Sequence, residues 1–171
     1  MDKLIRIPRN QTALMQHLQR QVSHGHFFWC ADQIPPEKLT GFVRKWAHYG
    51  LRADAPARAY RKQCRKASVH LCLSPECRLA EVETGPVGWW MLSTEGKDGL
   101  AEGKATPATV SDCRTAHGHL HYLDYELVQL VKEIRSGGKV KRAVTWTWRL
   151  VPERYREWEA LLVERAKQRD V

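Results

Sequence analysis

The chain has 171 residues, of which 43% are hydrophobic and seven are tryptophan, and it carries a formal net charge of +9. This composition excludes a wholly disordered chain, and no apolar run approaches the roughly 18 residues that a membrane-spanning helix needs. The five cysteines are odd in number and irregularly spaced, which argues against a disulfide framework. The basic start of the chain lacks the apolar stretch of a secretory signal. We therefore expect one soluble cytoplasmic domain, 1–171, with no membrane partner.

The first predicted element is a helix over about residues 11–22. Asn10 can cap it, and its apolar positions recur every four residues: Leu14, Leu18 and Val22. We expect residues 1–25 to form an N-terminal helical appendage. The aromatic segment 26–31 predicts a buried strand. Pro35 and Pro36 then begin a helix for which Gly50 is a natural end.

Two strands are predicted in the middle of the chain. Residues 67–73 alternate, with Val69, Leu71 and Leu73 on one face. Residues 87–93 form a short, strongly apolar segment. Adjacent Trp89 and Trp90 must point to opposite faces of a sheet, so one of them stays exposed unless helices cover both faces. The breaker-rich segment 94–118 is predicted to be a long surface loop.

Two patterns compete over residues 124–136. Leu127, Leu130, Val131 and Ile134 have helical spacing, whereas residues 123–127 alternate as in a strand. Residues 144–150 alternate strictly around Trp146 and Trp148, and a strand there needs a neighbour. We therefore favour a long β-hairpin around Gly137 and Gly138.

A C-terminal helix is predicted to begin at Pro152. The pattern as a whole predicts an α+β fold, with an antiparallel sheet of about four to five strands and helices packed against it.

The positive charge is concentrated in two stretches. Residues 41–70 hold eight Lys or Arg against one acid, and residues 129–149 hold six against one, whereas residues 71–128 hold nine acids against four bases. Such segregation is typical of a protein that meets a polyanion. A solvated helix face is the plainer alternative for the first stretch.

The predicted nucleic-acid contacts lie in these two stretches. In the first stretch, Arg58 to Lys66 have spacings of three and four that would line one side of a helix, and Tyr60 could stack on a base. In the second, the basic residues would lie on the hairpin, where exposed charges without a function are also common. The predicted set is Arg44, Lys45, Arg58, Tyr60, Arg61, Lys62, Arg65, Lys66, Lys139, Lys141, Arg142 and Arg149.

A pair of histidines suggests a different function. In a strand, His119 and His121 would point to the same face, as joint metal ligands must. The sequence His119-Leu120-His121 resembles the paired-histidine motif of rolling-circle replication initiators and relaxases. The resemblance implies a divalent metal at His119 and His121 that polarises a scissile phosphate, with Tyr155 or Tyr122 as nucleophile. A histidine-rich loop leading into a strand is the structural alternative.

Two further groups have plain interpretations. Cys64, His70, Cys72 and Cys77 are residue types that bind zinc, but their spacing is irregular and cysteine is often a small buried hydrophobe. Most aromatic residues fall on predicted core faces.

The sequence therefore predicts a nucleic-acid-binding protein, DNA or RNA, that contacts mainly phosphates and is not an enzyme. A metal-dependent nuclease or strand-transferase is one alternative. The other is an interaction subunit that binds an acidic protein partner or a second copy of itself.

Overall fold

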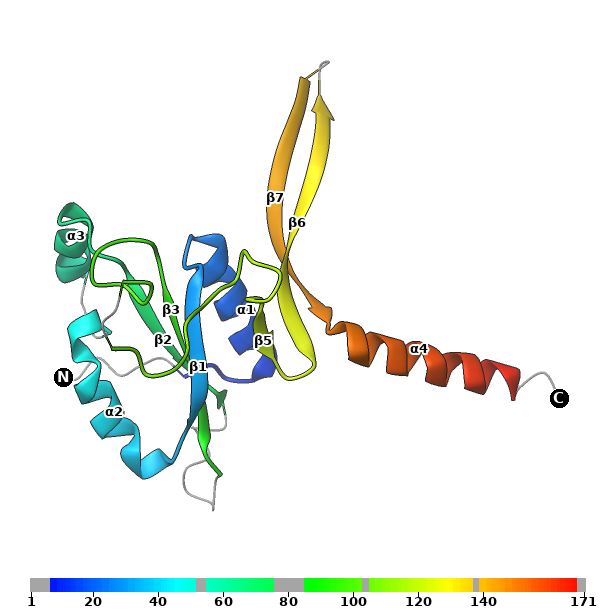
Figure 1. The fold of residues 1–171 in the computed structure, drawn as a ribbon, viewed down its shortest axis with the longest axis horizontal. Coiled ribbons are helices and arrows are strands. Elements are labelled where there is room, and N and C mark those ends of the chain that lie inside the picture. Colours follow the sequence, from blue (N-terminus) through cyan, green and yellow to red (C-terminus); the bar gives the residue numbers. More distant parts are fainter. Residues whose placement is uncertain (1–6, 52–54, 76–84, 103–104, 137–138, 169–171) are drawn as a thin grey trace. The chain divides into compact units, whose positions relative to one another are not determined.

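The computed structural model describes residues 7–51, 55–75, 85–102, 105–136 and 139–168. It confirms the α+β class: helices accompany two antiparallel sheets, with strand orders β2-β3-β1-β4 and β5-β6-β7 (Figure 1). The strands thus divide between two sheets, a separation that the sequence patterns did not reveal. Within the described ranges, no helix is both long and apolar enough to cross a membrane.

The chain forms two compact units, residues 1–118 and residues 119–171, which are described separately. The first unit contains, in chain order, α1 (Gln11–Ser23), β1 (Phe28–Ile34), the 3-10 turn η1 (Pro36–Lys38), α2 (Leu39–Lys45), the 3-10 turn η2 (Ala47–Tyr49), α3 (Ala55–Gln63), β2 (Val69–Leu73), β3 (Val87–Ser93) and β4 (Ser111–Asp112).

Helices cover both faces of the four-stranded sheet in the first unit. On one face, Trp89 packs against Phe42 of α2, with ring centroids 4.8 Å apart. The other face carries His70, whose ring lies 4.8 Å from that of His26 just after α1. Figure 1 shows α1 and α2 on opposite sides of this sheet. Consequently Trp89 and Trp90 are both buried, and neither is left exposed for a ligand.

Helix α1 is part of the core of this unit. Asn10 caps it, because its side-chain oxygen accepts a hydrogen bond from the Ala13 amide at 2.9 Å. Leu14, Leu18 and Val22 are fully buried, so the segment predicted as an appendage contributes apolar contacts that stabilise the unit.

The predicted loop 94–118 contains the two-residue strand β4 and contributes to the core. Leu100 and Cys113 are 2% and 1% exposed, respectively. The segment is therefore anchored at two points within its described part.

The second unit consists of β5 (Leu120–Tyr122), β6 (Tyr125–Ser136), β7 (Lys139–Leu150) and α4 (Pro152–Lys167). Strands β6 and β7 pair over their whole length, which confirms the hairpin and the strand interpretation of residues 125–136. Its turn, Gly137 and Gly138, lies outside the described residues. Pro152 occupies the start of α4, where its fixed φ suits a first helical turn. The predicted C-terminal helix is thereby confirmed.

Candidate functional site

The end of α3 determines where the basic residues of the first stretch lie. The helix stops at Gln63, and two hydrogen bonds close its end: the Lys66 amide donates to the Arg61 carbonyl at 2.9 Å, and the Arg65 amide donates to the Lys62 carbonyl at 3.0 Å. This is a Schellman motif, and it places Arg65 at the position that usually holds glycine. Arg65 has a left-handed φ of 54°. The prediction of one helical face through Lys66 was therefore wrong, since Arg65 and Lys66 lie beyond the helix.

Backbone hydrogen bonds tie residues 65–68 to residues 94–97. The Ala67 amide donates to the Lys97 carbonyl at 2.8 Å, and the Lys97 amide donates to the Arg65 carbonyl at 3.0 Å. The Ser68 amide donates to the Thr94 hydroxyl at 2.9 Å. Gly96, with a φ of +134°, lies so close that a Cβ there would be 2.9 Å from the Ala67 nitrogen. The two segments therefore form a fixed wall beside α3.

A hollow of about 670 Å³ lies between this wall and α3. We call it the basic hollow. Four predicted nucleic-acid contacts, two from α3 and two from the segment after it, belong to its lining. The lining consists of His24, Tyr49, Gly50, Ala59, Arg61, Lys62, Arg65, Lys66, Ser68, Val69, Thr94, Glu95 and Gly96.

Two of these four cations have structural partners. Arg61 donates from Nη2 to the Ala67 carbonyl at 3.0 Å, and its side chain packs over Gly50. Lys66 Nζ lies 2.8 Å from Asp98 Oδ2. This hydrogen-bonded pair raises the pKa of Lys66 and lowers the pKa of Asp98, so both groups are charged at neutral pH.

The other two cations, Lys62 and Arg65, have no ion-pair partner among the described residues. Both side chains line the hollow, and both residues are exposed. They are therefore the cations of this site that are best placed to meet an anion from solution.

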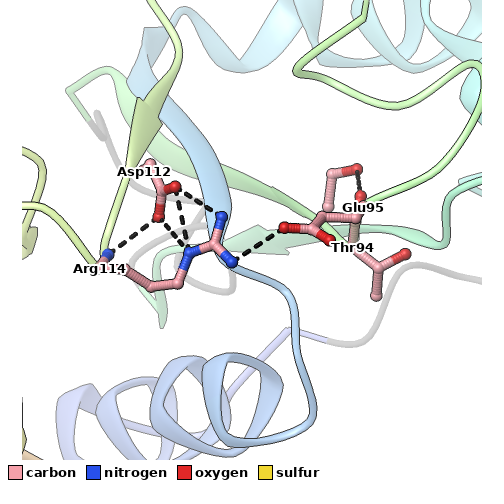
Figure 2. Close-up of polar contacts among 5 residues, drawn as sticks. Thr94, Glu95, Asp112 and Arg114 are labelled. Atoms are coloured by element: carbon pink, nitrogen blue, oxygen red, sulfur yellow. Dashed lines mark hydrogen bonds and ion pairs between the residues drawn. The ribbon is translucent and has the colours of Figure 1, made fainter.

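Glu95, the one carboxylate among the described residues of the lining, is paired with Arg114 (Figure 2). Arg114 Nη1 lies 2.9 Å from Glu95 Oε1, while Nη2 lies 2.7 Å from Asp112 Oδ2. The guanidinium also lies 4.6 Å from the ring centroid of Phe27, a cation–π contact. These hydrogen bonds, first of all that to Asp112, raise the pKa of Arg114, and the Arg114 side chain in turn lowers the pKa of Asp112. The single positive charge of Arg114 is shared between Asp112 and Glu95, so it offsets part of the negative charge that Glu95 brings to the hollow.

The remaining predicted contacts of the first stretch lie elsewhere. Tyr60 is 65% exposed on α3, and a hydrogen bond with Cys64 raises the pKa of its hydroxyl. Lys45 lies over the Trp46 ring at 5.2 Å and lines a different hollow. The described lining of the basic hollow contains neither Arg44 nor Lys45. The side chain of Arg58 lies outside the described part of the structure.

The predicted contacts on the hairpin do not share one face. Arg149 is paired in register with Glu126, and Arg142 with Glu133. Because side chains alternate between the two faces of a strand, the two arginines would share a face only if an even number of steps separated them along β7. Seven steps separate them, so they lie on opposite faces. Arg142 Nε is 3.8 Å from Glu133 Oε1, and both side chains are largely exposed. Lys139 and Lys141 belong to β7, but their side chains lie outside the described part.

The histidine pair lies beside a buried carboxylate. His119 Nδ1 donates to Glu126 Oε2 at 2.9 Å, and Arg149 Nε donates to Glu126 Oε1 at 2.7 Å. Burial raises the pKa of Glu126, but these two hydrogen bonds outweigh it and lower the pKa overall. Glu126 fixes the ring of His119, as a carboxylate does for a metal-ligating histidine. In the described part of the chain, no group of three or more residues could hold a metal ion.

The two tyrosines of the nuclease hypothesis differ in exposure. Tyr122 is 5% exposed and belongs to the core, whereas Tyr155 is 57% exposed. Tyr155 lines a hollow of about 450 Å³ together with Arg149 and Arg156. Only Tyr155 is thus accessible to a substrate.

Of the two described cysteines of the zinc hypothesis, Cys72 is buried and Cys64 is partly exposed. Burial raises the pKa of Cys72 to about 12, and Cys72 is 1% exposed. Among the described residues, no group of three or more His, Cys, Asp or Glu side chains is gathered as a zinc site requires. Cys77 lies outside the described residues.

Three charged residues that affect the charge of the hollow were not among the predicted site residues: the acids Glu95 and Asp98 and the base Arg114. They lie in the predicted surface loop, where single charges carry no periodic signal. A comparison with family models finds no match, and comparisons with curated proteins and with solved structures find none either.

Proposed function

We propose that the protein binds nucleic acid mainly through phosphate groups, without catalysing a reaction, and that the basic hollow is its principal contact. The observation that carries this proposal is that four cations line one hollow, whose described lining contains one carboxylate, Glu95, already paired with Arg114. Phosphate contacts need cations that reach a closely spaced anionic backbone, and each neutralised phosphate contributes salt-dependent affinity. Lys62 and Arg65 have that reach, because both are exposed.

The hairpin is a second contact in this proposal. Arg142 is largely exposed, and the basic residues of β7 extend along one ribbon. Arg149 contributes less, since its guanidinium is bound to Glu126. The proposal places the protein in the cytoplasm, where its four described cysteines remain thiols.

A salt-titrated binding assay tests the proposal. Fluorescence anisotropy would compare single-stranded DNA, duplex DNA and structured RNA with the purified full chain. We expect affinity to fall steeply with salt, and we expect the double variant Lys62→Glu/Arg65→Glu to lose most of it.

The matched control is Arg9→Glu/Lys38→Glu, which reverses the same number of exposed charges in the same unit at residues outside the described lining of the hollow. Equal losses in both variants would indicate a general effect of net charge and would contradict the site. Absence of any binding at about 150 mM salt would favour an acidic protein partner instead.

A metal-dependent nuclease or strand-transferase is the second candidate. It is favoured by the contact between His119 and Glu126, which orients one histidine of the pair, and by the exposed Tyr155. Its test is cleavage of single-stranded DNA with Mg²⁺ or Mn²⁺. Cleavage that is lost in His121→Ala and in Tyr155→Phe would establish it, and no cleavage in the unmodified protein would exclude it.

A further inference from the structure

We infer that the basic hollow takes one unpaired nucleotide, so that the protein prefers single strands over duplexes. This inference rests on the proposed function and adds the class of nucleic acid. Its first support is shape. A volume of about 670 Å³ lies within the roughly 300–1,000 Å³ range of small-ligand sites. The phosphates of a duplex lie on a convex cylinder and can meet only the rim of such a hollow, whereas an unpaired nucleotide can enter it.

The chemistry of the lining suits a nucleotide better than a bare phosphate. Lys62 and Arg65 supply positive charge, and the hydroxyls of Ser68 and Thr94 can contact a phosphate or a sugar. Thr94 accepts a hydrogen bond from the Ser68 amide, so its own hydroxyl hydrogen is available to donate. Apolar side chains such as Ala59 and Val69 provide surface for a base.

The backbone of Arg65 is a separate observation. A left-handed φ of 54° is unfavourable for arginine, and glycine is the usual residue at this point of a Schellman motif. The helix end does not require a side chain here. The strain at Arg65 is therefore consistent with a cation retained for contact with a ligand, because strained residues concentrate at functional sites.

Tyr60 offers an exposed stacking surface on α3, the helix that contributes Arg61 and Lys62 to the lining. The residue is 65% exposed. A neighbouring unpaired base could stack there, and stacking is the usual sequence-tolerant contribution to single-strand binding. A duplex does not offer a base face at that point.

The decisive variant fills the hollow without changing charge. Ala59→Trp introduces a large side chain at an exposed lining position, and Ala57→Trp makes the same change on α3 outside the lining. Anisotropy would be measured with a dT oligonucleotide and with a duplex of equal length, and circular dichroism would confirm folding. We expect the unmodified protein to bind the single strand about tenfold more tightly. We expect Ala59→Trp to remove that preference and Ala57→Trp to keep it.

Arg65→Gly provides a second test that retains the fold. It removes the cation while allowing the left-handed backbone, and it should weaken single-strand binding. Leu123→Gly is its control, because Leu123 also has a positive φ but belongs to the second unit and carries no charge. This variant should bind the single strand as tightly as the unmodified protein.

The outcomes separate this inference from the proposed function. Equal affinities for single strand and duplex, both lost in Lys62→Glu/Arg65→Glu, would overturn the inference and keep the function. Unchanged preference in Ala59→Trp would also overturn it. No binding to either nucleic acid would overturn both.

Discussion

Arg114 and Glu95 are 19 residues apart in the chain, and their ion pair, with Nη1 and Oε1 2.9 Å apart, offsets part of the charge of the one carboxylate in the described lining of the basic hollow. Replacing Arg114 with alanine would expose that charge to an incoming phosphate. We expect nucleic-acid affinity to fall about two- to fivefold at low salt, because an unpaired carboxylate in the lining repels a phosphate and low salt screens that repulsion weakly.

The double variant Arg114→Ala/Glu95→Gln should recover the part of that affinity lost through Glu95. Asp112 loses its arginine partner in both variants, so the comparison isolates the charge of Glu95. Binding would be followed by anisotropy at several salt concentrations. If the double variant binds as weakly as Arg114→Ala, Arg114 acts through the local structure and not through the charge of Glu95.

Arg65→Gly is expected to stabilise the fold while it weakens binding. Removing the left-handed strain should raise the free energy of unfolding by about 0.5–1 kcal/mol. Leu123, with a φ of 51°, should respond to glycine in the same direction. Urea unfolding of both variants measures the effect, and a destabilised Arg65→Gly protein would show that the arginine side chain supports the helix end.

His26 should make stability depend on pH. Burial lowers its pKa below the ordinary value of 6.5, although a hydrogen bond from Nδ1 to the Gln21 carbonyl opposes this, and positive charge on His24 and His17 lowers the pKa further. Its Nε2 is buried and has no partner among the described residues. Because the unfolded chain takes up the proton more readily, stability is complete above pH 6.5 and is lost as the pH falls towards the lower folded value.

The variant His26→Asn tests this dependence. Asparagine keeps a donor near the Gln21 carbonyl but does not titrate, so its urea stability should change less between pH 7.5 and pH 5.5 than that of the unmodified protein. Identical pH profiles would contradict the role of His26.

Glu126 should stabilise the second unit through His119 and Arg149. Glu126→Gln keeps the size of the side chain but removes the charge, and we expect a loss of about 1–3 kcal/mol at pH 7. Since the pKa of Glu126 is lowered in the fold, this contribution exists above the ordinary value of 4.5 and is lost as the pH falls. The difference between the two proteins in urea unfolding should accordingly shrink at low pH. A constant difference would indicate a steric effect.

Leu18 and Leu162 give matched truncations in a buried and an exposed helix. Leu18 is 0% exposed in α1, whereas Leu162 is 63% exposed in α4. Leu18→Ala should lower the free energy of unfolding by about 2–5 kcal/mol, and Leu162→Ala should change it by less than about 0.5 kcal/mol. A large loss in Leu162→Ala would reveal that α4 is covered in solution.

The sequence was informative where periodicity was strong. The alternation around Trp146 and Trp148 predicted β7, and the need of that strand for a partner correctly favoured β6 over a helix. Asn10 and the four-residue spacing after it predicted α1, although the sequence did not show that its apolar stripe is buried in the core.

The site was harder to predict, because it depends on contacts between distant segments. The end of α3 carries no glycine at Arg65, so the usual sequence signal for a Schellman motif is missing. The pairs Lys66–Asp98 and Arg114–Glu95 join segments that no local pattern connects. The cations were therefore identified as a group, while their division into paired and unpaired members required coordinates.

The close approach of Gly96 to Ala67 has a thermodynamic consequence for any ligand of the hollow. The wall there consists of main chain held by amide–carbonyl bonds, so its form does not depend on which rotamers neighbouring side chains adopt. Recognition then requires only the long side chains of Lys62 and Arg65 to become ordered, which limits the entropic penalty of association. The hollow is in this sense a preformed receptor.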